Sequence, residues 1–83
     1  MKIRVYSLEL DAIVMTFSTS SYKGLMEHVC MEHACRNADD YSDLMKDEGL
    51  IKHFKNVWEE LKKYKVYNDY NKVTDFIFMN CDA

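Results

Sequence analysis

The N-terminal part of the sequence predicts a β-hairpin. Two runs rich in β-branched and aromatic residues, 2–10 (KIRVYSLEL) and 12–18 (AIVMTFS), follow one another. In the second run Ile13, Met15 and Phe17 take every other position, which is the two-residue period of a β-strand. A short turn joins the two runs.

The segment after the hairpin predicts a helix that ends at about Asn37. The letters STSS (18–21) stand directly before a helical pattern of apolar residues. A serine side-chain oxygen at this position accepts a hydrogen bond from a backbone amide that has no partner within the helix. Ser20 or Ser21 is therefore the expected N-cap.

A short second helix is expected within 37–49 (NADDYSDLMKDEG). Asp39 or Asp40 can cap its N-terminus, and Gly49 is expected to close or kink it. Its apolar residues, which recur at helical spacing, are Tyr41, Leu44 and Met45.

The helical pattern is clearest in 50–67 (LIKHFKNVWEELKKYKVY). Acidic residues precede this segment and lysines end it, which is the arrangement that the helix dipole favours. The apolar positions recur at helical spacing and should face the core: Leu50, Ile51, Phe54, Val57, Trp58, Leu61 and Tyr64.

A last strand is expected in 72–80 (KVTDFIFMN), where Val73, Ile77 and Met79 share one face and phenylalanines occupy the other. The elements therefore follow the order ββαα(α)β. We expect an α+β fold in which a small antiparallel sheet, made of the hairpin and the C-terminal strand, has two or three helices packed on one face. A chain of 83 residues should form a single domain, 1–83.

The repeat MEHVCMEHAC (26–35) contains candidate metal ligands and nucleophiles. Residues five apart on a helix differ by roughly 140° in direction, so neither the two histidines nor the two cysteines of the repeat converge. His28, Glu32 and Cys35 share a side but span two turns, and we expect no metal, no cofactor and no enzymatic activity. A thiol or metal protein built around Cys30, His33 and Cys35 is one alternative.

Charge is distributed unevenly along the chain. Segment 27–48 has seven acids and two bases, a formal charge of −5, whereas 50–72 has six lysines and three acids, a charge of +3. A nucleic-acid-associated regulator that uses the basic helix 50–67 is a second alternative. We do not favour direct nucleic-acid binding, because acids interrupt the lysines and arginine is nearly absent from this half of the chain.

The acidic segment is the preferred candidate for a partner-binding surface, since clustered carboxylates can imitate nucleic-acid phosphates. The alternative is that these acids only cap helices and keep the protein soluble. The loop expected at 67–70 is the other candidate, because tyrosines are frequent in contact surfaces. The candidate residues are Asp39, Asp40, Tyr41, Asp43, Asp47, Glu48, Tyr67 and Tyr70.

The chain is short, lacks proline and is rich in Lys, Asn, Tyr, Asp and Met. In this general character it resembles accessory proteins of bacteriophages, including anti-CRISPR and other anti-defence proteins. The resemblance implies a cytoplasmic inhibitor or modulator that covers a functional surface of a larger host protein, such as a basic nucleic-acid-binding groove. We expect no membrane association, and a homodimer that pairs edge strands remains an alternative.

Overall fold

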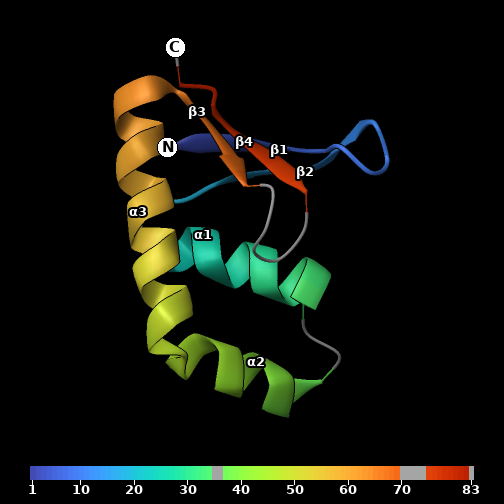
Figure 1. Ribbon diagram of the computed structural model, residues 1–83, viewed down its shortest axis with the longest axis vertical. Coiled ribbons are helices and arrows are strands. Elements are labelled where there is room, and N and C mark those ends of the chain that lie inside the picture. Colours follow the sequence, from blue (N-terminus) through green and yellow to red (C-terminus); the bar gives the residue numbers. More distant parts are fainter. Residues whose placement is uncertain (35–36, 70–74, 83) are drawn as a thin grey trace.

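In the residues that the computed structural model describes, 1–34, 37–69 and 75–82, four strands form an antiparallel sheet (Figure 1). The strands are β1 (Lys2–Ser7), β2 (Ala12–Ser18), β3 (Val66–Asp69) and β4 (Phe76–Asn80), in the order β2-β1-β4-β3. The N-terminal and C-terminal strands are therefore neighbours in the middle of the sheet. The predicted α+β class and the order ββαα(α)β are confirmed, but β3 lies where a loop was expected.

The hairpin of β1 and β2 contains a β-bulge that breaks the predicted alternation. Val5 lies opposite Met15 and Tyr6 opposite Ile13, so Val14 is the additional residue on β2. The bulge reverses the direction of the side chains that precede it. Met15 consequently faces the core, whereas Ile13 lies on the opposite side of the sheet and is 48% exposed.

Three α-helices lie in the described part of the chain: α1 (Tyr22–Val29), α2 (Ala38–Lys46) and α3 (Glu48–Tyr64). A π-helical turn, η1 (Cys30–Ala34), extends α1. Ser21 caps α1 through a hydrogen bond from the Gly24 amide, which confirms one of the two expected caps. The cap predicted for α2 was wrong, because the Asn37 carboxamide oxygen accepts the Asp40 amide at 2.9 Å.

The chain bends between α2 and α3 at Asp47, which has an extended backbone and caps α3. Gly49 lies in the first turn of α3, so the expectation that it ends or kinks a helix was wrong. At the other end, α3 stops at Tyr64 because Lys65 adopts the left-handed conformation with φ 69°. The basic helix expected over 50–67 thus ends three residues earlier than predicted, at Tyr64, and Val66 already belongs to β3.

The core lies between the sheet and the pair α1 and α3, which cover one face of the sheet (Figure 1). One stripe position was wrong, because Tyr64 is exposed. Leu50, Ile51 and Trp58 are half-buried and pack against the core. Helix α2 has no fully buried residue and lies beyond the N-terminal end of α3, away from the sheet. The fully buried apolar side chains are Ile3, Val5, Leu25, Met26, Val29, Cys30, Phe54, Val57, Leu61 and Phe78.

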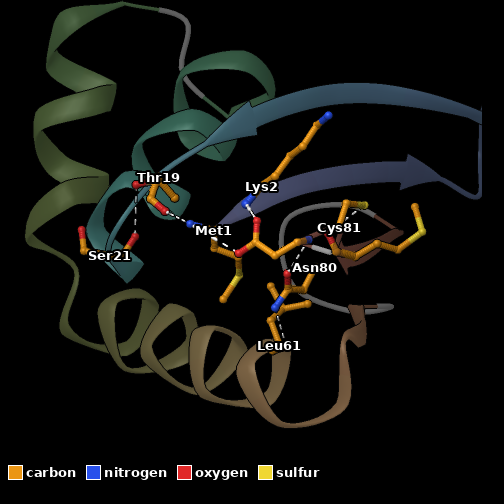
Figure 2. Close-up of polar contacts among 9 residues, drawn as sticks. Met1, Lys2, Thr19, Ser21, Leu61, Asn80 and Cys81 are labelled. Carbon is orange, nitrogen blue, oxygen red and sulfur yellow. Dashed lines mark hydrogen bonds and ion pairs between the residues drawn. The ribbon is translucent and has the colours of Figure 1, made fainter.

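Asp82 connects the two ends of the described chain through Met1 and Lys2, which are labelled in Figure 2. Its carboxylate accepts a hydrogen bond from the Lys2 amide at 2.8 Å and lies 3.8 Å from the ammonium group of Met1. The same ammonium group donates to the carbonyl of Thr19 at 2.7 Å. These contacts hold the beginning of β1 between the end of β2 and the segment that follows β4.

Candidate protein-interaction surface

Carboxylates gather on α2 and on the first turn of α3. The segment from Ala38 to Glu48 contains five acids and one base, a formal charge of −4. All of these acids except Asp40 are exposed, and Asp40 is half-buried. The structure therefore brings the predicted acidic residues together on adjacent elements, and we call this set the acidic surface: Asp39, Asp40, Asp43, Asp47 and Glu48.

Four of these carboxylates lie where they stabilise helices. The Asp47 side chain accepts a hydrogen bond from the Leu50 amide at 2.9 Å and so caps α3. Glu48 lies in the first turn of α3, and Asp39 and Asp40 lie in the first turn of α2. Negative charge at these positions interacts favourably with the helix dipole.

Asp43 is different, because it lies beyond the first turn of α2. It follows Asp39 by four residues, so the two exposed carboxylates are neighbours on the same side of the helix. Like charges at this spacing destabilise a helix by about 0.2–0.5 kcal/mol. Helix capping and the helix dipole therefore do not account for Asp43.

The opposite side of α2 packs against the rest of the protein. Leu44 and Met45 are half-buried against the core, and Tyr41 is half-buried one turn earlier. Their spacing of three and four residues places the three side chains on one side of the helix. Tyr41 thus belongs to the packed side, and only part of it is accessible to a partner.

Of the two tyrosine candidates near the C-terminal end, Tyr67 lies in a strand and not in the expected loop. Tyr67 lies in β3 opposite Phe78, half-buried against the core, with its ring 6.1 Å from that of His53 in an edge-to-face arrangement. Tyr70 lies outside the described residues. The structure therefore assigns Tyr67 to core packing.

The cysteine and histidine candidates differ in how deeply their side chains are buried. Cys30 is fully buried in the core, whereas His28 is exposed, stacks on Phe17 with ring centres 4.1 Å apart, and has its Nδ1 2.8 Å from the Gly24 carbonyl. Neither Cys35 nor the His33 side chain lies among what the structure describes. Within the described residues, no three histidine, cysteine or acidic side chains are placed to hold a metal ion.

The lysines of α3 are partly engaged within the protein. Lys62 forms an ion pair with Glu59 at 3.0 Å, and the ammonium group of Lys55 lies 5.2 Å from the centre of the Tyr22 ring. Surface pairs of this kind contribute little to stability, but they place acidic and aromatic groups among the lysines. This arrangement differs from the continuous basic stripe that is typical of a nucleic-acid-binding helix.

Sequence reasoning missed one exposed surface, on the side of the sheet that faces away from the helices. Its central residues are Tyr6 on β1 and Ile77 on β4, which lie opposite each other. The signal was present in the sequence: the run FIFM of β4 is apolar at consecutive positions, whereas a strand with one solvated face alternates.

Comparison of the chain with protein-family models, with curated proteins and with solved structures finds no match in any of the three. Within the described residues, no helix combines the length and the apolar character that crossing a membrane requires. The functional proposal therefore rests on the geometry of the chain itself.

Proposed function

We propose that this protein is a non-enzymatic binding module that inhibits or modulates a larger protein by covering a basic, nucleic-acid-binding groove. One observation carries the proposal: α2 contributes no fully buried residue to the core and yet holds Asp39 and Asp43 exposed on one side. A helix with little part in the core is available for contact with a partner.

The acidic surface has the chemistry for such a contact. Asp39 and Asp43 are separated by one helical turn, about 6 Å along the axis, and Glu48 on α3 adds a further exposed carboxylate. A row of negative charges on a rigid element attracts a basic groove over a distance and orients the two proteins during encounter. This is the mode of action that phage anti-defence proteins suggest by analogy.

Charge reversal tests the proposal. A variant with Asp39→Lys and Asp43→Lys changes the charge of the acidic surface by +4 without removing the α3 cap. Its control carries Glu9→Lys and Glu59→Lys, the same change in charge at exposed positions outside α2. Wild type and both variants are immobilised and exposed to lysate of the native host.

We expect the wild type and the control to capture a nucleic-acid-binding protein from the lysate, and the acidic-surface variant not to capture it. Added salt or duplex DNA should release the captured protein. Salt should weaken the complex because exposed charges are screened. Retention by the acidic-surface variant at undiminished affinity, or a complex that DNA does not displace, would contradict the proposal.

A further inference from the structure

The face of the sheet that is turned away from α1 and α3 carries a row of apolar side chains. The strand register places Tyr6 beside both Ile13 on β2 and Ile77 on β4. One step along the strands, Met79 on β4 lies opposite Val66 on β3. We call these five residues the outer patch.

The outer patch does not belong to the core. Ile13 and Val66 are 48% and 47% exposed. Tyr6, Ile77 and Met79 are half-buried, but they are not among the side chains that pack against the core cluster. Their partial burial therefore reflects contact with neighbouring strands rather than cover by a helix.

An antiparallel sheet with one face in water normally shows polar residues on that face. Strand β4 departs from this rule, since Phe76 and Phe78 are buried on the helix side while Ile77 and Met79 occupy the other. A strand that is apolar on both faces is typical of a sheet covered on both sides. The outer patch is thus suited to a covering layer that the chain itself, over the described residues, does not provide.

Two positive charges lie next to the outer patch. Arg4 is exposed on β1 between Met79 and Thr16, and Lys2, two residues earlier on β1, lies on the same face. Among the strand residues whose side chains the structure describes, Lys2 and Arg4 are the only charged ones. The covering layer should therefore combine apolar residues with carboxylates.

We propose that the outer patch binds an amphipathic helix of a partner protein, which presents apolar side chains to Tyr6 and Ile77 and a carboxylate to Arg4. The complex would have a helix on each face of the sheet, a common three-layer arrangement. This surface is separate from the acidic surface and carries charge of the opposite sign.

Size and charge favour a helix over a second copy of this chain. Four strands span about 14 Å between the outermost strand axes, which matches a single helix of about 10 Å diameter. A stable dimer usually buries about 800 Å² on each partner, which corresponds to roughly 20–30 residues, whereas the outer patch consists of five residues. A face-to-face dimer would also bring Arg4, on a central strand, close to its own copy.

Two synthetic peptides provide the probe. Both are amphipathic helices of about 20 residues with a leucine stripe, long enough to be helical in water. One has glutamates and the other lysines beside the stripe. Binding is followed by backbone amide chemical shifts in NMR titrations. We expect the glutamate peptide to shift amides of β1 and β4 and to bind about tenfold more tightly than the lysine peptide.

Variants of the protein separate charge from apolar contact. Arg4→Glu should reverse the preference between the two peptides, whereas the control Lys55→Glu on α3 should leave it unchanged. The double variant Ile77→Thr, Val66→Thr keeps the β-branched shape of both side chains. It should lower the affinity for the glutamate peptide about tenfold, and its melting temperature verifies that the fold is retained. These variants should retain the partner captured by the acidic surface, which keeps the two proposals distinguishable.

The proposal fails if the glutamate peptide does not shift the outer patch, or if Arg4→Glu leaves the preference unaltered. Two other results would also overturn it. Concentration-dependent dimerisation with shifts at the outer patch would identify a second copy as the occupant. Sedimentation with anionic lipid vesicles, without peptide binding, would identify a membrane surface.

Discussion

The side-chain amide of Asn80 donates a hydrogen bond to the backbone carbonyl of Leu61 at 3.3 Å and thereby joins β4 to the last turn of α3 (Figure 2). The backbone amide of Asn80 also donates to the carbonyl of Lys65 at 2.8 Å, and its side-chain oxygen accepts the Asp82 amide at 3.0 Å. Asn80, on an inner strand of the sheet, therefore fixes the C-terminal end of α3, the longest helix.

Replacement of Asn80 by alanine should lower the free energy of unfolding by about 1–2 kcal/mol, because a partly buried and an exposed hydrogen bond are lost together. Asn68→Ala, at an exposed position of the edge strand β3, is the control and should change it by less than about 0.5 kcal/mol. Urea unfolding measures both. Equal effects of the two substitutions would show that the link to α3 contributes nothing.

Lys65→Gly should stabilise the protein by up to about 1 kcal/mol. Lys65 ends α3 with a positive φ, a conformation that a residue with a Cβ adopts at a cost and that glycine adopts freely. Lys62→Gly, three residues earlier within α3, should instead destabilise by about 1 kcal/mol. Thermal unfolding of the two variants should thus shift in opposite directions, and a loss of stability in Lys65→Gly contradicts the explanation for the helix end.

Gly24→Ala should destabilise the protein, because a Cβ at this position would lie 1.8 Å from the Thr19 hydroxyl oxygen. Relief requires a shift of α1 relative to the chain before it, and overpacking of this kind costs about 1–3 kcal/mol. At Gly49 the nearest atom is 3.3 Å away, so Gly49→Ala should change stability by less than about 1 kcal/mol. Chemical denaturation should separate the two variants, and similar midpoints would argue against the close approach.

Phe54→Ala should cost about 3–5 kcal/mol, since Phe54 is fully buried between α3 and the sheet. Trp58, one turn later, is only half-buried, so Trp58→Ala should cost clearly less. The comparison is informative because the sequence pattern gives the two aromatic residues equal status. A Trp58→Ala protein less stable than Phe54→Ala would mean that the centre of the core lies closer to Trp58.

Local patterns in the sequence were sufficient for the fold class and for most elements. Serines before an apolar stripe predicted the α1 cap, and the helical spacing of Phe54, Val57 and Leu61 predicted the buried side of α3. These features depend on residues close together in the sequence. The expected acidic residues also lie together because a single bend at Asp47 separates α2 from α3.

The errors arose where one residue overrides a periodic pattern. The additional residue Val14 reverses the face of Ile13, and no sequence period indicates a bulge. The turn at Lys65 lacks the glycine that usually marks a helix end, so the sequence pattern predicts a longer helix and a loop where β3 lies. Asn37 could have been found, because asparagine is as good an N-cap as aspartate.

The pairing of β1 with β4 has a consequence for how the chain folds. Val5 and Phe78 come from opposite ends of the sequence and lie side by side in the middle of the sheet. Such distant contacts slow folding, because a long loop must close before they form. While the chain is being synthesised, the β1 edge of the hairpin stays unpaired until β4 leaves the ribosome. We therefore expect a late, concerted folding step, and a hairpin that is prone to aggregate in chains truncated before β4.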